Sequence, residues 1–585
     1  MQAQTLINEF IHFFEQQGHQ RISAGPLASP PDDTTLFTSA GMQPLIPYLS
    51  GLPHPQGRRL VDVQPCIRTV DIDEVGDTTH LTFFEMLGNW SLGDYFKPES
   101  IRMSYEFLTK YLDIDRQRLW VTVFSGDESA PPDDVSPEIW RKVGIPTERI
   151  VPLGRADNWW GPVGNTGPCG PDTEIFFDVG RPSCGIHCQP GCSCGRFIEI
   201  WNNVFMEYDR TVDGRDHLLP QQGVDTGMGV DRVIAVIQRH DSVFDTELFQ
   251  PLMGQLPSEI SDNDTLSRRI VVDHIKAATM IIGEGTKPGN KRQGYVVRRL
   301  IRRAVDHGRR LKMEPGFIRE LAKTVIGMYQ TRYPHLIPQR NEILNTLQLE
   351  ESSFNKTIER GQRVFQKQIK QVKETKQDTL SGKTVFHLFD TYGIPPELTE
   401  EWATEQDLKV DHSGFDIALA EHREISGGGK QGEFAGGLAS RDSKTVQLHT
   451  ATHLLHQALR DVLGPHVAQK GSHITPDRLR FDFSHPMKLT DEEQSQVEAQ
   501  VNDQIQANLP VNWVEVDPGT ARKMGAIGLF EDKYGDRVKV YSIGDYSREI
   551  CGGPHVSRTG ELGHFRIMRE QSSGAGVRRI RAVVE

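Results

Sequence analysis

The sequence has 585 residues, of which 37% are hydrophobic and 25% charged, and its formal net charge is −13. A chain of this length is too long for one hydrophobic core and predicts about three or four domains. It has no apolar stretch of the length that spans a bilayer, so we expect no membrane partner. Seven cysteines argue against a disulfide scaffold and favour a reducing compartment, which predicts a cytoplasmic protein.

The first twenty residues predict an amphipathic helix rather than a signal peptide. They contain acidic residues and lack a basic amino-terminal region, and Gly18 suits the end of a helix. The apolar residues at helical spacing are Leu6, Ile7, Phe10, Phe13 and Phe14.

A candidate nucleotide site follows. Residues 60–68 predict a strand that ends at Arg68, and the segment from His80 to Phe96 predicts an antiparallel partner strand. Strand alternation would place His80 and Phe84 on one face. Together these residues offer a guanidinium fork for a phosphate, a second polar contact and an aromatic plate for a purine.

Four cysteines lie within eleven residues of the stretch SCGIHCQPGCSCG, between two predicted strands. Glycines and a proline supply tight turns, so the four thiolates are expected to enclose one structural Zn²⁺ ion. The alternatives are a set of free loop thiols, or a site in which His187 replaces one cysteine. Cys66 and Cys169 lie outside the cluster and are expected to be packed thiols. The cluster consists of Cys184, Cys188, Cys192 and Cys194.

Further along, a glycine-rich turn from Gly227 to Gly229 leads into a predicted helix that carries Arg232. This position suits a second guanidinium for a triphosphate.

Between Lys287 and Lys312 there are ten Lys or Arg residues and one acid, Asp306. Arginines repeat at i, i+4 beside an apolar stripe, without the alternating glutamates of a solvated helix. Like charges repel, so we expect an anionic partner such as a phosphate backbone to neutralise them, although net charge argues against a nucleic acid. The alternative is a solvated basic helix.

Near the C-terminus, HTATHLLH places His449 and His453 on one face of a predicted helix. This spacing suits either a metal ion or a polar helix edge. Cys551 and His555 repeat the four-residue step, and the four side chains together match zinc in number and chemical softness. His456 is expected to be an ordinary surface residue. Thr450 stands where a metallopeptidase would need glutamate, which argues against a peptidase.

The segments around Arg68 and Arg232 resemble the second and third signature motifs of class II aminoacyl-tRNA synthetases. Longer stretches resemble the alanyl-tRNA synthetase family, in order, from about residue 5 to the last residue. These stretches are FTSAGMQPLIPYLSG, FFEMLGNWSLGDYF, GNTGPCGPDTEIFFD, EIWNNVFMEYDR, VDTGMGVDR, YVVRRLIRRAVDHG, FDTYGIPPELT, HTATHLLH, QKGS and CGGPHVSRTGELGHF.

The resemblance implies a multidomain α+β protein. A class II antiparallel sheet with flanking helices would occupy residues 1–240, with the cysteine-rich insertion at residues 183–195. A mostly helical domain that recognises the tRNA acceptor stem would follow at 241–425. A glycine-rich linker at 426–445 would lead to an α+β, zinc-dependent editing domain at 446–585.

The resemblance also implies roles at the aminoacylation site, with ATP, Mg²⁺ and alanine bound there. Arg68 would hold the α-phosphate, Phe84 would stack on adenine and Arg232 would contact the far phosphates. The remaining residues expected at this site are Trp160 over the alanine methyl group, Asn202 beside the substrate, Asp225 on the α-ammonium group, and His80, Met86 and Gly227.

In this family the tRNA is read at a G·U pair of the acceptor stem. Asn290 and Asp390 match the reading positions, and an amide and a carboxylate can both read base edges. The arginines expected to hold the RNA backbone are Arg298, Arg299 and Arg302.

The histidine–cysteine set would then be the zinc site of an editing domain that hydrolyses mischarged seryl- and glycyl-tRNA. A methyl pocket cannot exclude glycine and rejects an added hydroxyl group only weakly, so a second site must complete the discrimination. Gln469 matches a position that contacts the serine hydroxyl. Zinc could activate water there or orient the substrate.

Two family features are missing, namely a β-barrel subdomain before HTATHLLH and a C-terminal domain that aids dimerisation and grips the tRNA elbow. We therefore expect a monomer. Two alternative functions remain, a tRNA deacylase and a tRNA-binding paralogue that does not charge tRNA.

Overall fold

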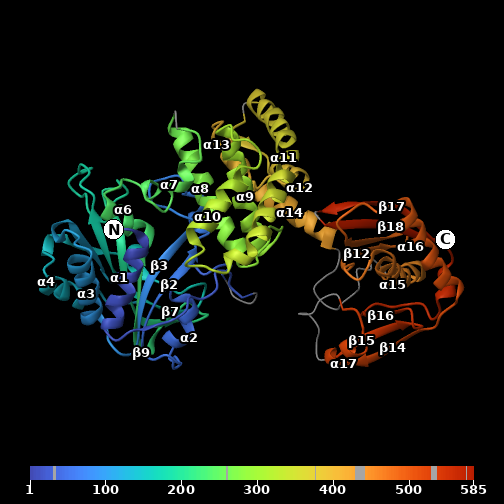
Figure 1. The fold of residues 1–585 in the computed structure, drawn as a ribbon, viewed down its shortest axis with the longest axis horizontal. Coiled ribbons are helices and arrows are strands. Elements are labelled where there is room, and N and C mark those ends of the chain that lie inside the picture. Colours follow the sequence, from blue (N-terminus) through green and yellow to red (C-terminus); the bar gives the residue numbers. More distant parts are fainter. Residues whose placement is uncertain (31–34, 259–260, 376, 428–441, 529–536, 575) are drawn as a thin grey trace. The chain divides into compact units, whose positions relative to one another are not determined.

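The structure is a computed structural model that describes residues 1–30, 35–258, 261–375, 377–427, 442–528, 537–574 and 576–585 (Figure 1). Contacts within the chain divide it into two compact units, Met1–Val410 and Asp411–Glu585. The predicted linker at 426–445 falls largely on residues 428–441, which lie outside the described residues. The further division of the first unit at residue 240 stays a prediction. Among the described helices, none is both long and apolar enough to cross a membrane.

The first unit is built on a mixed sheet whose strand order is β1-β2-β3-β9-β8-β7-β4-β5, with β6 paired to β7. Neighbouring strands are antiparallel, except for the parallel pairs β1–β2 and β4–β5 at the two edges. The bounds are β1 Gln20–Arg21, β2 Arg59–Ile67, β3 Phe83–Leu92, β4 Leu119–Phe124, β5 Ile150–Leu153, β6 Trp159–Trp160, β7 Gly167–Asp178, β8 Phe197–Arg210 and β9 Asp216–Gly229.

Helices cover this sheet because each presents one apolar face to it. Helix α1, Ala3–Gln16, confirms the prediction for the N-terminal segment, and its buried face includes Leu6, Phe10 and Phe14. It packs beside α6, Val230–Gln238, against the sheet (Figure 1). The remaining helices around the sheet are α2 Ile46–Leu49, α3 Lys97–Glu106, α4 Val135–Val143 and α5 Arg155–Asn158.

The rest of the first unit is mostly helical. Its elements are α7 Gln250–Met253, α8 Asp262–Gly283, α9 Arg292–Arg310, α10 Phe317–Tyr329, α11 Leu336–Glu374, α12 Gly382–Tyr392, α13 Pro396–Thr404 and the short pair β10 Thr379–Leu380 and β11 Lys409–Val410. The buried carboxylate of Glu85 on β3 joins this region to the sheet, since it accepts hydrogen bonds from Arg332 and Tyr333 at 2.8 to 3.0 Å.

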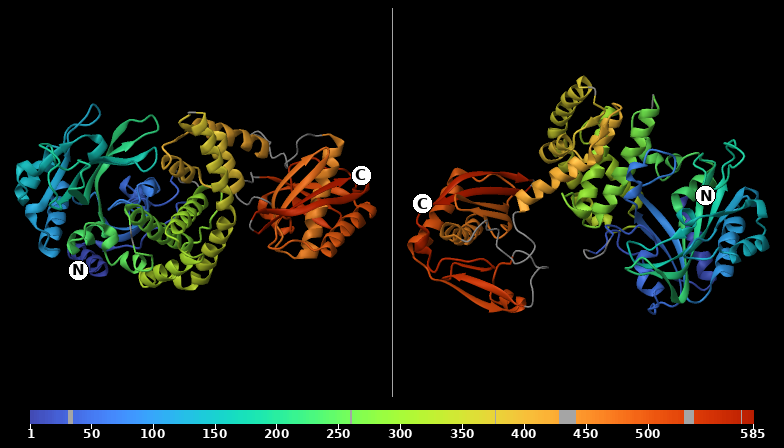
Figure 2. Two further views of the ribbon diagram at one scale, coloured as in Figure 1. Left: turned by 90° about the horizontal axis from the view of Figure 1, so that it is seen from above. Right: turned by 180° about the vertical axis from the view of Figure 1, so that it is seen from behind.

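The second unit contains two sheets, ordered β12-β13-β18-β17 and β14-β15-β16. Helices α15 and α16 contact each other and cover one face of the first sheet (Figure 2). Their apolar side chains, such as Leu448 and Leu455, form a core with Phe481. The bounds are α14 His412–Gly427, α15 Ser443–Leu463, β12 Gln469–Thr475, β13 Arg478–Ser484, α16 Asp491–Gln506, β14 Val511–Val516, α17 Pro518–Lys523, β15 Val538–Ile543, β16 Ser547–Ile550, β17 Phe565–Gly574 and β18 Val577–Val584.

Candidate functional sites

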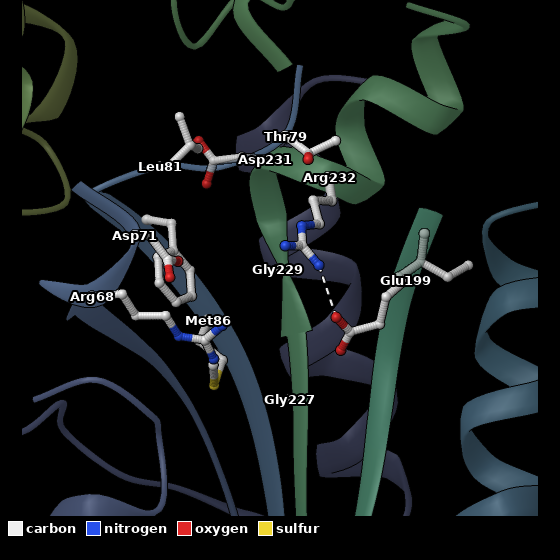
Figure 3. Close-up of a pocket in the computed structure, with 12 residues that line it drawn as sticks. Arg68, Asp71, Thr79, Leu81, Met86, Glu199, Gly227, Gly229, Asp231 and Arg232 are labelled. Atoms are coloured by element: carbon white, nitrogen blue, oxygen red, sulfur yellow. Dashed lines mark hydrogen bonds and ion pairs between the residues drawn. The ribbon is translucent and has the colours of Figure 1, made fainter. Parts of the chain in front are cut away.

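A pocket opens over the sheet of the first unit, where β2, β3, β8 and β9 lie side by side. Figure 3 shows the guanidinium groups of Arg68 and Arg232 facing the same space from different elements. Arg68 follows the end of β2, and Arg232 lies in the first turn of α6. The other lining residues are Asp71, Thr79, Leu81, Phe84, Met86, Glu199, Ile200, Gly227, Gly229 and Asp231.

Both arginines are held by neighbours within the protein. The Arg68 guanidinium lies 5.0 Å from the centre of the Phe84 ring and donates to the carbonyl oxygen of Ser39 at 3.3 Å. Arg232 Nη1 contacts Glu199 Oε2 at 2.8 Å. The pocket therefore offers two oriented cations beside an aromatic ring. This is the arrangement that the sequence predicts for binding a nucleoside triphosphate.

The prediction that His80 shares a strand face with Phe84 is wrong. Strand β3 begins at Phe83, and His80 lies in the turn before it. The carboxylate of Asp77 accepts hydrogen bonds from the backbone N–H groups of Thr79 and His80, which curls this segment out of an extended conformation. A further bond to Asp77, 2.6 Å from His80 Nδ1, raises the pKa of this histidine.

The residues expected to meet an amino acid lie on β6, β8 and β9 and are not among those that line this pocket. Asp225 is buried, and its Oδ1 accepts a hydrogen bond from Trp90 Nε1 at 2.7 Å. Burial raises the pKa of Asp225 to about 7. Asn202 Nδ2 donates to Asp172 at 3.1 Å, and Trp160 packs against the apolar cluster around Met86.

Gly227 packs closely against Met86. A Cβ atom built on Gly227 would lie 3.0 Å from the sulfur of Met86, so a larger residue there would require the methionine side chain to shift. Both residues line the pocket.

The arginines of α9 are neutralised by acids of the chain itself, so their charges do not by themselves require an anionic partner. Arg302 lies 2.6 Å and Arg298 lies 3.2 Å from the carboxylate of Glu350 on α11. Arg299 pairs with Asp73. These acids are distant in sequence, so the local pattern could not show them. Asn290 and Asp390 are both exposed, and Asn290 also accepts a hydrogen bond from Arg298. The role of these residues in tRNA binding stays a prediction.

In the second unit the four predicted ligands come together. His449 and His453 lie on α15, while Cys551 and His555 follow β16. One donor atom from each of the four lies within 4.8 Å of the others.

The hydrogen bonds around these histidines leave one ring nitrogen of each facing the centre. The Nδ1 atom of His449 lies 3.0 Å from the carbonyl oxygen of Pro554, and that of His555 lies 3.2 Å from Thr450 Oγ1. The Nδ1 atom of His453 lies 2.8 Å from Glu549. The Nε2 atoms of His453 and His555 are buried without a hydrogen-bond partner. These donors fit a zinc ion, since partners on Nδ1 fix the ring tautomer that binds metal through Nε2.

Two residues of this site were missed by the sequence analysis. His456, predicted to be an ordinary surface residue, is only 1% exposed, and its Nδ1 lies 3.0 Å from Glu549 Oε1. Glu549 is buried and bridges His453 and His456. Its position two residues before Cys551 places both on one face of an extended segment, and this period of two could have identified it. Gln469 begins β12, opposite Phe483, and its contact with the serine hydroxyl stays a prediction.

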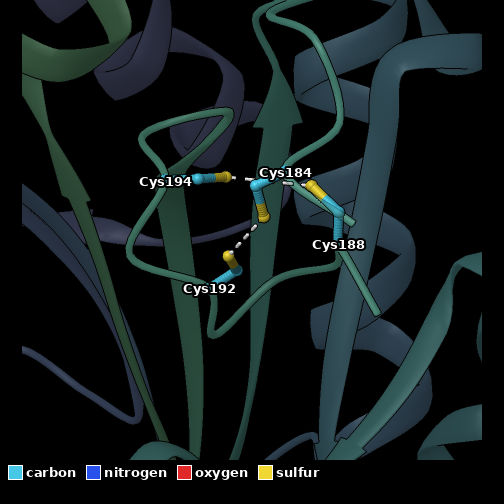
Figure 4. Close-up of side chains that lie close together, drawn as sticks. All are labelled: Cys184, Cys188, Cys192 and Cys194. Carbon is cyan, nitrogen blue, oxygen red and sulfur yellow. Dashed lines mark hydrogen bonds between the residues drawn. The ribbon is translucent and has the colours of Figure 1, made fainter. Parts of the chain in front are cut away.

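The cysteine-rich loop also brings its four predicted ligands together (Figure 4). The four sulfur atoms lie within 4.8 Å of one another, and the exposed His187 is not part of this group. Cys66 and Cys169 are buried and separate from the cluster, which confirms the prediction that they are packed thiols.

Comparisons with known proteins agree with this architecture. The family described as tRNA synthetases class II (A) matches residues 5–467. The family described as Threonyl and Alanyl tRNA synthetase second additional domain matches residues 538–581. The fold and the pocket thus define a class II aminoacyl-tRNA synthetase.

Individual relatives narrow the family. The alanine–tRNA ligase of Treponema pallidum (strain Nichols) is 52% identical over 595 residues, covering 100% of this chain and 98% of that protein. That of Alkaliphilus oremlandii (strain OhILAs) is 37% identical, covering 98% of this chain and 78% of that protein. A solved structure of apo histidyl-tRNA synthetase from S. aureus matches 41% of this chain and 67% of that one at 12% identity, with a TM-score of only 0.27. The chain belongs to the alanine–tRNA ligase family.

Proposed function

We propose that this protein attaches alanine to tRNA(Ala) through alanyl-adenylate, and that its second unit hydrolyses mischarged seryl- and glycyl-tRNA(Ala). The observation that carries the proposal is the joint placement of Arg68, Phe84 and Arg232 around one pocket, with the buried carboxyl of Asp225 in the same sheet. The cysteine content supports a cytoplasmic location.

In the first step, a carboxylate oxygen of alanine attacks the α-phosphorus of ATP, and pyrophosphate leaves. Arg68 neutralises charge that grows on the α-phosphate, while Phe84 stacks on adenine. Arg232 exchanges its contact with Glu199, 2.8 Å away, for the far phosphates. Mg²⁺ prefers oxygen ligands, and Glu199 and Asp71 supply carboxylates at the pocket wall. A ribose hydroxyl of the tRNA then attacks the carbonyl carbon of alanyl-adenylate, and AMP leaves.

Three further residues bind alanine itself. Asp225 pairs with the α-ammonium group, and this cation favours ionisation of the buried carboxyl. Asn202 positions the substrate and Trp160 closes the space over the methyl group. A pocket of this kind discriminates weakly against glycine and serine, so hydrolysis at a second site is needed.

The second unit suits that hydrolysis. The Nε2 atoms of His449, His453 and His555 and the sulfur of Cys551 would hold Zn²⁺. A bound zinc ion supplies Lewis acidity toward the ester carbonyl or toward water. Glu549 orients the His453 ring, and Gln469 contacts the serine hydroxyl group. Asn290 and Asp390 read the acceptor stem while the arginines of α9 contact its backbone.

The test is amino-acid-dependent ATP–pyrophosphate exchange with alanine, serine, glycine and threonine, followed by hydrolysis of seryl-tRNA(Ala). Strong exchange with alanine and weaker exchange with serine and glycine are expected. Seryl-tRNA(Ala) hydrolysis without any alanine-dependent exchange would overturn the synthetase proposal and leave a tRNA deacylase. Binding of tRNA without exchange or hydrolysis would leave a tRNA-binding paralogue.

A further inference from the structure

The connection between β7 and β8 carries a cluster of thiols far along the chain from the histidine–cysteine site. Cys184 and Cys192 lie 3.3 Å apart, Cys188 and Cys194 lie 3.8 Å apart, and all four sulfur atoms fall within 4.8 Å of one another. Figure 4 shows the four side chains converging from different points of one loop.

These separations match a tetrathiolate metal site. Four Zn–S bonds of about 2.3 Å in a tetrahedron place the sulfur atoms about 3.8 Å apart. A disulfide needs sulfur atoms about 2.05 Å apart, which is much shorter than either of the separations given above. A thiolate set of this kind selects zinc or iron over harder cations.

The local sequence turns the thiols inward. The backbone N–H of Cys188 donates to the carbonyl oxygen of Gly185 at 3.2 Å, and that of Cys192 donates to Gln189 at 3.1 Å. Gly191 has a φ of 90°, a left-handed conformation that favours glycine. Cys188 and Cys192 are therefore presented from tight turns.

This loop has little apolar packing to hold its shape. Ile186, the large apolar side chain at its tip, is 96% exposed, and Cys184 is exposed as well. A short segment that cannot build a core is commonly stabilised by a metal. Without a bound metal, ordering the turns of this loop would cost conformational entropy that little apolar burial offsets.

An arginine also lies near the cluster. The guanidinium of Arg181 lies 2.6 Å from a Cβ atom built on Gly195, the residue after Cys194. Four thiolates on one Zn²⁺ carry two excess negative charges, which a nearby cation partly offsets. Hydrogen bonds and charges beyond the ligands are the usual support of a metal site.

We propose that Cys184, Cys188, Cys192 and Cys194 bind one structural Zn²⁺ ion that fixes the β7–β8 connection. The loop is closed at its base by Arg196, whose guanidinium contacts the carboxylate of Asp178 at 2.6 and 3.0 Å. The backbone N–H of Val179 also donates to the carbonyl oxygen of Arg196 at 2.9 Å. Beyond this base, Asn202 on β8 donates a hydrogen bond to Asp172 on β7 at 3.1 Å, so the metal would hold together the ends of the two strands that carry this pair.

The test measures zinc by elemental analysis in the purified protein and four variants. Wild type is expected to hold about two zinc ions per chain, and both Cys551→Ala and Cys192→Ser about one. Cys169→Ser is the matched control, since it changes a buried thiol outside both clusters and should leave the zinc content unchanged. Cys192→His retains a ligand and should keep the ion, which separates loss of a ligand from failure to fold.

A second measurement identifies the ligands directly. Cobalt is loaded in place of zinc in the Cys551→Ala variant, which removes the thiolate of the histidine–cysteine site, so that thiolate-to-cobalt absorption reports on the cysteine cluster. Intense thiolate-to-cobalt absorption is expected, and its disappearance on adding Cys192→Ser would assign it. Wild type with one zinc ion that Cys551→Ala removes and Cys192→Ser leaves in place would overturn the proposal. Bound iron, or two disulfides among the four cysteines by mass spectrometry, would overturn it equally.

Discussion

The pocket of the first unit and the histidine–cysteine site of the second satisfy their polar groups in different ways. In the pocket, Arg232 already contacts Glu199 at 2.8 Å. In the second unit, the Nε2 atoms of His453 and His555 are buried without hydrogen-bond partners. A substrate binds and is released at each turnover, so a side chain such as Arg232 can exchange its internal partner for the substrate and pair with that partner again afterwards. A resident metal needs donor atoms that no other group occupies, and the two unpaired Nε2 atoms meet this requirement. An unpaired buried nitrogen does not identify a metal site by itself, since His456 Nε2 is also unpaired.

The largest effect is expected from removing a pocket cation. Arg68→Ala should lower alanine-dependent ATP–pyrophosphate exchange about 10²- to 10³-fold, because one oriented charge on the reacting phosphate is lost. Zinc content and seryl-tRNA hydrolysis should stay unchanged. Arg215→Ala removes an exposed arginine that is paired with Asp213 and serves as the control. A loss of less than about tenfold would show that Arg68 does not contact the α-phosphate.

The second prediction concerns Glu549, which orients the histidines of the candidate zinc site in the second unit. Glu549→Gln should weaken zinc binding and seryl-tRNA hydrolysis about 10- to 100-fold, because the amide cannot accept hydrogen bonds from both His453 and His456. Competition with a chelator measures the affinity, and ATP–pyrophosphate exchange should not change. Glu515→Gln, at a half-exposed position, is the matched control. Unchanged zinc affinity would contradict the positioning role of Glu549.

Helix α9 is intermediate between the two sites. Its arginines are paired within the protein, while Asn290, just before the helix, is exposed. Asn290→Ala should lower kcat/KM for tRNA charging roughly 5- to 150-fold, which corresponds to about 1–3 kcal/mol of transition-state stabilisation, and should leave ATP–pyrophosphate exchange intact. Replacing the G·U pair of the acceptor stem with G·C should impair the wild type but add little to the variant. Additive losses would show that Asn290 does not read this pair.

The smallest effect concerns pH. Because burial raises the pKa of Asp225 to about 7, the free protein carries this carboxyl largely protonated at pH 6 and largely ionised at pH 8. The ionised form is the one that pairs with an ammonium group, so kcat/KM for alanine in the exchange reaction should rise about tenfold between these values. The residual activity of Asp225→Asn should lose this rise, and an unchanged profile would assign the ionisation to another group.

Local patterns predicted the elements and both metal-ligand sets, because their residues are close in sequence or repeat a fixed spacing. The i, i+4 histidines and the four clustered cysteines are of this kind. The carboxylates that neutralise α9 could not be found in this way, since Glu350 lies 48 residues from Arg302 and Glu401 lies 98 residues from Arg303. A basic helix without acids nearby in the sequence therefore does not reveal whether it binds an external anion or pairs with distant acids of its own chain.

His80 shows a second limit of pattern reasoning. Alternation alone extended the strand to His80, but the Asp77 carboxylate binds the backbone N–H groups that a strand would need for pairing. An aspartate shortly before a predicted strand competes for its first hydrogen bonds. This side-chain competition decided where β3 begins.

The division into Met1–Val410 and Asp411–Glu585 has a consequence for how the protein melts. The core around Leu448 and Phe481 belongs wholly to the second unit, so its cooperativity is separate from that of the first. Calorimetry should therefore resolve more than one transition, and a single Tm would not describe the molecule. A destabilising change in one unit would raise the unfolded fraction of that unit alone. Such a change in the second unit would therefore impair the proposed hydrolysis of mischarged tRNA while the first unit still attaches alanine to tRNA.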